Sequence, residues 1–237
     1  MFTLRRTLLN QSTKGLFQYN KQNIIRMSSG FSNANTGDKP ADPYAAANAD
    51  PKVTLKEKVE ALSKFANNCK FGMMTTRDTS NGKLSSRCMA VAGQETGGLD
   101  LIFTTNTESH KTDELAKDAH TNISFVDASG QWASFAGDAS IETDRAIVKK
   151  YYSPALKAWL GDLGDGKHDG SENDPRIGII RVKTDSVSYC LTDMTLIGRM
   201  TEIAKGAVTG QPASINKLRF ISEAEVLQWR ASESLRT

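Results

Sequence analysis

The sequence has few cysteines and no long apolar run, and each shortage argues against a class of protein. Its three cysteines, Cys69, Cys88 and Cys190, are isolated and form no C-x-x-C pair. This argues against a structural zinc site and a disulfide framework, and it indicates a reducing compartment. No segment approaches the roughly 18 uncharged apolar residues that a membrane-spanning helix needs. We therefore expect no membrane partner.

Acidic residues are missing from one end of the chain. Residues 1–37 contain no Asp or Glu but five Lys or Arg residues, so the total formal charge of +3 leaves −2 for the remainder. A body so close to neutral offers no broad basic surface for nucleic acid. The basic, hydroxyl-rich residues 1–27 are typical of a presequence for the mitochondrial matrix, with a disordered tail as the alternative. A second start at Met27 would give a cytoplasmic form.

Motifs for the common nucleotide, metal and hydrolase sites are also absent. The chain has no G-x-G-x-x-G after a strand, no G-x-x-x-x-G-K-[ST] and no G-x-S-x-G. Its three histidines are too scattered to indicate a metal, and the acidic stretch "GDLGDGKHDGSENDP" does not fit the ligand spacing of an EF-hand. We interpret that stretch as a mobile loop over a pocket. No catalytic acid or base is identified.

Short strands separated by turns dominate the central part of the chain. Residues 28–53 read as a disordered linker, and Thr54 with Glu57 forms a capping box that starts a helix. Seven strand candidates follow: 71–76, 84–92, 99–105, 122–126, 131–141, 177–183 and 186–191. Asn81-Gly82 is a strong hairpin signal. This regular spacing favours a mainly β fold, a small antiparallel barrel with flanking helices, over a parallel sheet.

Helical patterns interrupt and follow these strands. One helix is expected to start near Ser109 and another to cover about 144–152. A third, about 194–208, has an apolar stripe that we interpret as core packing. The domain is therefore placed at 54–208. Residues 209–237 are expected to form a C-terminal arm that packs on the domain or on a partner.

Hydroxyl, imidazole and ammonium groups gather where a strand candidate passes into a helix. They belong to Thr104, Thr105, Ser109, His110 and Lys111. The start of a helix has unpaired N–H groups and a partial positive charge, and with these side chains it suits a dianionic phosphate. The alternative is ordinary: Ser109 caps the helix, while Lys111 is solvated.

Two further positions support a ligand site. Arg87 shares a strand face with Met89, and an Arg on a barrel strand is costly unless it meets an anion. Trp132 lies on the strand face that also carries small residues, where a planar ligand would fit. Each has a simpler reading, a surface arginine and a packing tryptophan.

Four stretches in order, "FGMMTT…GKLSSRCMAV", "LIFTTNTESHKTDEL", "NISFVDASGQWASFAGDA" and "DPRIGIIRVKTDSVSY", resemble the FMN-binding split-barrel family. The resemblance covers about residues 55–230. It is closest to the general-stress-protein subgroup related to pyridoxamine 5′-phosphate oxidase, and the tail is similar to fungal blue-light-inducible relatives. It implies a six-stranded antiparallel split β-barrel and a homodimer with FMN at the subunit interface.

The resemblance also implies residue roles. Arg87 and Lys111 would bind the phosphate, with hydroxyl contacts from Ser109 and Thr105. The backbone at Met89 and Ala90 would face the flavin ring. The remaining expected contacts are Thr104, His110, Trp132 and Trp159. The tryptophans would line the pocket, either from the same chain or from the second subunit.

Departures from the family pattern narrow the expected function. Cys88 replaces a usual Pro, and a small filler is a simpler reading than a redox thiol. A C-terminal Arg-x-His, which pyridoxamine phosphate oxidases use on their substrate, is absent. We expect an FMN-dependent oxidoreductase passing electrons or hydride between NAD(P)H and an unknown acceptor. The alternatives are a non-catalytic flavin-binding stress-response protein and a pyridoxamine 5′-phosphate oxidase-like enzyme.

Overall fold

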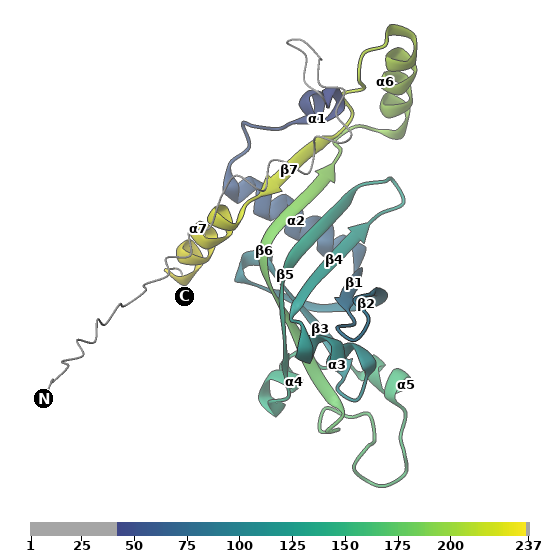
Figure 1. Ribbon diagram of the computed structural model, residues 1–237, viewed down its shortest axis with the longest axis vertical. Helices are drawn as coiled ribbons and strands as arrows, with labels where there is room; N and C mark the ends of the chain where they lie inside the picture. Colours follow the sequence, from purple (N-terminus) through teal and green to yellow (C-terminus); the bar gives the residue numbers. More distant parts are fainter. Residues whose placement is uncertain (1–41, 236–237) are drawn as a thin grey trace, which may run out of the picture. The chain divides into compact units, whose positions relative to one another are not determined.

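Six antiparallel strands close into a barrel in the computed structural model, which describes residues 42–235 (Figure 1). The neighbours follow the order β3-β2-β1-β4-β5-β6, and β3 pairs again with β6 to close the ring. The strands are β1 (Phe71–Arg77), β2 (Leu84–Glu95), β3 (Asp100–Asn106), β4 (His120–Val126), β5 (Trp132–Glu142) and β6 (Ile177–Leu191). This confirms the expected six-stranded antiparallel split barrel. The expected presequence, 1–27, lies outside the described residues.

Alternating side chains fill the barrel. Met74, Phe103, Ile123 and Phe135 are fully buried, each on a different strand, and every second residue beside them faces outward. Gly137 lies where β5 and β6 shift register, and a Cβ there would stand 2.1 Å from the carbonyl oxygen of Lys183. Only glycine permits that approach, which accompanies an extra residue on β6 at the register shift.

Helices cover the barrel at several places. α2 (Leu55–Cys69) begins with the expected capping box and buries Val59, Leu62, Phe65 and Ala66 in the main core. α3 (His110–Lys117) follows β3 directly. On the outer side of β3 and β6, α4 (Arg145–Tyr151) packs Val148 against a second apolar cluster. That cluster contains Ile102, Ile177 and Ile179. The strand β3 is therefore covered on both faces.

Part of the expected linker is ordered, so the prediction of disorder up to residue 53 was wrong from Pro43 onward. α1 (Pro43–Asn48) ends at a buried asparagine. The amide of Asn48 donates to the carbonyl oxygen of Ala213 (3.0 Å), and its oxygen accepts from the N–H groups of Ile215 and Asn216. These long-range polar contacts hold the segment in place, and composition alone does not reveal them.

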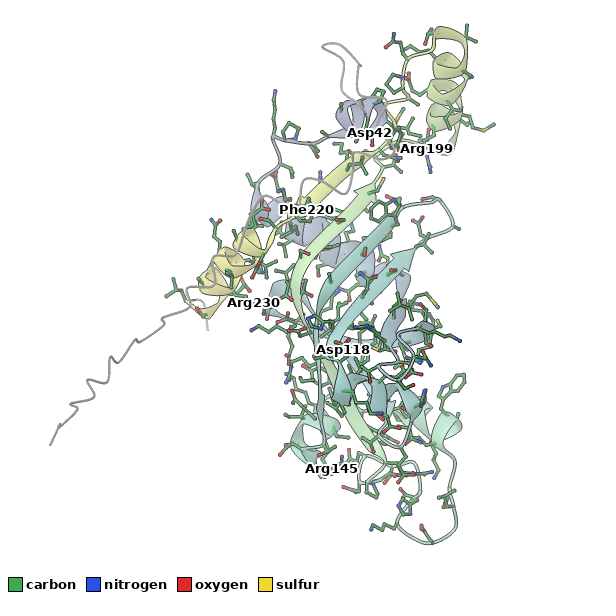
Figure 2. The ribbon with its side chains drawn as sticks, viewed as in Figure 1. Asp42, Asp118, Arg145, Arg199, Phe220 and Arg230 are labelled. Atoms are coloured by element: carbon green, nitrogen blue, oxygen red, sulfur yellow. The ribbon has the colours of Figure 1, made fainter. Side chains whose placement is uncertain are left out.

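The C-terminal arm packs on the same domain. It contains a short strand, β7 (Lys217–Ile221), beside β6 and a helix, α7 (Glu223–Ser234). No strand was expected at β7 from the sequence. Trp229 of α7 joins the main core, and Arg230, labelled in Figure 2, donates to both carboxylate oxygens of Asp100 at 2.5 and 2.6 Å. The arm thus belongs to the fold.

α6 (Leu196–Thr209) is a helix where one was expected, but its apolar stripe is not core. Ile197, Met200, Ile203 and Val208 are 78%, 65%, 51% and 88% exposed. Figure 1 shows that α6 lies beyond the end of β6, away from the body of the barrel. The interpretation of the stripe as core packing was wrong. Among residues 42–235 no helix combines the length and apolarity that a membrane crossing requires.

Candidate functional site

Arg87 lies at one end of the barrel, on the face of β2 that points inward. Its Nη1 donates to Thr76 Oγ1 (2.5 Å) and its Nη2 to Glu114 Oε2 (3.0 Å). Thr76 comes from β1, and Glu114 from α3. Because both partners are almost fully buried while the Arg87 side chain is 27% exposed, the guanidinium stands between them and solvent. Arg87 is therefore a fixed cation that remains accessible.

Lys111 provides a second cation beside Arg87. Its side chain is half-buried, and its Nζ donates to Ser109 Oγ (2.8 Å). Burial, together with the nearby charge of Arg87, lowers the pKa of Lys111. Within the described chain, Lys111 forms an ion pair with no carboxylate. The two cations singled out in the sequence thus lie together, and an anion between them would relieve their repulsion.

Ser109 does not act as a simple helix cap. It occupies the N-cap position of α3, yet its side chain makes no capping hydrogen bond and accepts from Lys111 instead. His110 is largely exposed, with its Nε2 3.4 Å from Glu114 Oε1. Thr105 is buried and donates to the carbonyl oxygen of Asn106. Ser109 therefore belongs to the cationic cluster, while the hydroxyl hydrogen of Thr105 is engaged by its own neighbour in the chain.

A cavity of about 360 Å³ lies farther along β2 and beside β3. It brings together Ala90 of β2, Thr104 of β3 and Trp159 of α5 (Lys157–Leu160). The wall opposite the strands comes from α4 and the turn after it: Tyr151, Tyr152, Ser153 and Leu156. Met89, one residue before Ala90, packs its side chain against the core, so only its backbone can face the cavity.

The aromatic wall is held by specific contacts. The hydroxyl of Tyr151 donates to Glu95 (2.5 Å), and that of Tyr152 donates to the carbonyl oxygen of Gly170 (3.0 Å). Gly93 makes room for the first ring, because a Cβ there would stand 2.7 Å from Tyr151. Tyr151 is therefore fixed against β2, and Tyr152 against the loop that contains Gly170.

The expected mobile loop, residues 161–175, is anchored where it leads into β6. Asp174 is fully buried and accepts from Arg176 Nη2 (2.6 Å), and this ion pair holds the pKa of Asp174 well below its usual range. Arg176 also donates to the carbonyl oxygens of Leu160 and Gly161. Since these residues follow Trp159 directly, the anchor also fixes the position of Trp159, which is 87% exposed at the cavity edge.

Trp132 does not join this cavity within one chain. It lies on the outer face of β5, opposite Val126 of β4, whereas Ala90 lies opposite Phe71 of β1. Three strand spacings of about 4.8 Å each separate β2 from β5, so Trp132 is roughly 14 Å from Ala90. Within one chain, Trp132 therefore does not reach the cavity that Trp159 borders, and the expectation that it lines the pocket from the second subunit stays a prediction.

Four residues of this region were not expected from the sequence: Thr76, Glu114, Tyr151 and Tyr152. A signal existed for two of them. The hairpin register places Thr76 diagonally across from Arg87, and Glu114 follows His110 at the i,i+4 spacing that brings helix side chains together. The two tyrosines had no local signal, because packing of α4 on the sheet decides their position.

Comparisons with known proteins show the family of this chain. Residues 57–214 match the model of the family described as pyridoxamine 5′-phosphate oxidase like. The chain belongs to this family. Protein bli-3 of Neurospora crassa is 56% identical over 204 residues, which cover 86% of this chain and 98% of that protein.

Two solved structures resemble this chain at low sequence identity. A general stress protein 26 from Jannaschia has a TM-score of 0.53 at 17% identity, covering 70% of this chain and 98% of its own. A related protein from Clostridium acetobutylicum has a TM-score of 0.47 at 20% identity, covering 58% and 89%. The first supports the split-barrel fold. At this low identity, the roles of individual site residues follow only from the geometry of this chain.

Proposed function

We propose that this protein binds FMN, with the phosphate at Arg87, Ser109 and Lys111 and the flavin ring in the cavity at Ala90, Thr104 and Trp159. The observation that carries the proposal is the convergence of two cations, one of them half-buried and without a carboxylate partner in the described chain. Membership of the pyridoxamine 5′-phosphate oxidase-like family supports it.

The donor set fits a phosphate. A guanidinium has five N–H groups, of which Thr76 and Glu114 engage two, so three remain for a ligand. The Lys111 ammonium has three and uses one. The start of α3 adds backbone N–H groups and a partial positive charge. Such charge-assisted contacts contribute about 1.5–3 kcal/mol each.

The protein's own residues would hold the ring and exclude water. Bound FMN supplies electron and hydride transfer, and we infer an oxidoreductase that takes electrons from NAD(P)H for an acceptor yet to be identified. The hydroxyls of Tyr151 and Tyr152 are both engaged as donors. Because both hydroxyl hydrogens are bonded to protein oxygens, neither tyrosine is set up to donate a proton to a substrate. This favours a second candidate, a non-catalytic flavin-binding protein. NAD(P)H oxidation by the FMN-loaded protein, with and without acceptors, separates the two.

We also propose that two copies associate through the outer face of β1, β2, β4 and β5. Two rows of paired, outward-facing residues cross this face without a charge: Cys88, Met73, Ser124 and Ser134, then Ser86, Thr75, Asn122 and Ala136. Depletion of charge is typical of the centre of a protein–protein interface. A second copy there would offer a Trp132 from outside the chain to the cavity.

The dimer is tested by sedimentation of the purified protein. Ser124→Lys puts a charge at the centre of the face and should give monomers. Leu227→Lys, which replaces an exposed apolar residue on α7, should leave the dimer intact. A wild-type protein that sediments as a monomer at high concentration would refute the dimer but not FMN binding.

Flavin binding is tested by the visible spectrum and by titration with FMN. We expect wild-type protein to be yellow. The double variant Arg87→Ala, Lys111→Ala should lose at least about 100-fold in FMN affinity, since it removes two charge-assisted contacts. Lys117→Ala removes an exposed cation from the same helix and serves as the control. A wild type that stays colourless with added FMN would overturn the proposal.

Finally, we propose that residues 1–27 direct the chain to mitochondria, on the composition of the segment alone. Residues 1–30 fused to a fluorescent reporter should localise the reporter to mitochondria. Reporter confined to the cytosol would reject this proposal.

A further inference from the structure

We infer that Glu114 is a positioning residue for phosphate recognition, which acts by holding Arg87 in a binding-competent orientation. The inference rests on the proposed FMN function. Glu114 is on α3, one helical turn after Lys111, and its side chain is 3% exposed. It lies on the buried side of Arg87, so it is placed to support the guanidinium.

Three side chains from three elements form a closed set of hydrogen bonds. Arg87 of β2 donates to Glu114 Oε2 (3.0 Å) and to Thr76 Oγ1 (2.5 Å), and Thr76 of β1 donates to Glu114 Oε2 (2.5 Å). Each group is bound to both others. An arginine side chain has considerable rotamer freedom, and two fixed contacts remove most of it before a ligand arrives.

Glu114 is held as a charged group. Burial raises the pKa of its carboxyl, but hydrogen bonds from Thr76 and Arg87 and the charge of Arg87 outweigh that effect, and the net pKa is lowered. The carboxylate therefore forms a charge-assisted bond to Arg87 at neutral pH. Such bonds are shorter and more directional than those between neutral groups.

The other carboxylate oxygen shows that the arrangement is not optimised for stability. Oε1 of Glu114 is buried and has no hydrogen-bond partner among residues 42–235, and His110 Nε2 lies 3.4 Å from it. Buried polar atoms are nearly always paired, and an unpaired one costs stability. Since the single bound oxygen serves Arg87 and Thr76 only, orienting Arg87 is the role that the geometry supports.

Removing Glu114 could change the affinity for a dianion in either of two directions, and the direction tests the inference. If Glu114 only offsets the positive charge of Arg87 and Lys111, its removal should strengthen the binding of a dianion. If it orients Arg87, removal should weaken it. The contrast between FMN and riboflavin isolates the phosphate, because riboflavin lacks it and has the same ring.

The experiment measures the affinities of FMN and riboflavin by fluorescence quenching. We expect Glu114→Ala to weaken FMN binding at least tenfold and riboflavin binding less than twofold. Glu114→Gln keeps an acceptor oxygen and should recover part of the loss. Asp113→Ala removes the adjacent, exposed carboxylate of α3 and should change neither affinity.

The outcomes separate the inference from the function on which it depends. Wild type that binds FMN, combined with unchanged or tighter FMN binding by Glu114→Ala, overturns the inference alone. Wild type that does not bind FMN overturns the proposed function. If Glu114→Ala fails to fold, Thr76→Val breaks another side of the same hydrogen-bonded set. It should then weaken FMN binding and spare riboflavin, and equal FMN affinity would reject the inference.

Discussion

α2 and α6 both place apolar residues at helical spacing, and both begin at a threonine whose hydroxyl accepts a backbone N–H. Their environments differ completely. Leu62 of α2 is fully buried, whereas Ile203 of α6 is 51% exposed and Val208 88%. Apolar periodicity thus predicted both helices correctly, but it did not predict what would cover them.

The difference comes from how each helix is attached. α2 lies against the barrel and shares its core with Tyr189 and Trp229. α6 is attached by polar contacts at its two ends. Near its start Arg199, labelled in Figure 2, donates to the carbonyl oxygen of Ser129, and after its end Asn48 holds residues 213–216. Apolar burial fixes one helix, and hydrogen bonds fix the other.

The largest effect is expected in α2. Leu62→Ala should lower the free energy of unfolding by about 2–5 kcal/mol, because it leaves a cavity in a fully buried position. Urea denaturation followed by circular dichroism measures this. A loss below about 1 kcal/mol would mean that α2 does not depend on the core.

A smaller loss is expected at the polar attachment after α6. Asn48→Ala should cost about 1–3 kcal/mol, because it leaves three backbone groups of residues 213–216 without their partner. Amide hydrogen exchange should then rise at Ile215 and Asn216 while the amides of α2 stay protected. Equal exchange throughout would show that Asn48 does not hold this end.

Tyr189 links α2 to the barrel and makes its stability depend on pH. Its hydroxyl donates to the carbonyl oxygen of Lys58 (2.8 Å), and burial raises the pKa of Tyr189 to about 12. In the unfolded chain a tyrosine hydroxyl ionises near pH 10. The contribution of Tyr189 to the free energy of unfolding is therefore complete below about pH 10 and is lost as the pH rises toward 12. Tyr189→Phe should cost about 0.5–1.5 kcal/mol at pH 7. In thermal melts above pH 10, the melting temperature of the Tyr189→Phe variant should fall less steeply with pH than that of the wild type.

The smallest effect is expected on the exposed stripe. Ile203→Ala should change the stability of the monomer by no more than about 0.5 kcal/mol, since little apolar area is lost from the core. The measurement is urea denaturation at low protein concentration. A loss above about 1 kcal/mol would show that the stripe is covered in solution, and the contrast with α2 would disappear.

The candidate site divides in the same way into local and non-local parts. Arg87, Ser109 and Lys111 could be found from the sequence, because a strand arginine and a strand-to-helix junction are local patterns. For Glu114 the sequence indicated only that it lies one helical turn after His110, on the same side of the helix. That it would meet Arg87 depends on how α3 lies over the end of the barrel, which no local pattern specifies.

By itself, the sequence determined α2, α3, α4 and α6, the barrel strands apart from the continuity of β6, and the chemical types available for a phosphate, because periodicity, caps and turns act over a few residues. The tertiary structure alone decided that β3 closes on β6, that α6 leaves its stripe exposed and that Thr76 and Glu114 fix Arg87. These outcomes depend on contacts between residues far apart in the chain, whose free energies exist only once the barrel has formed.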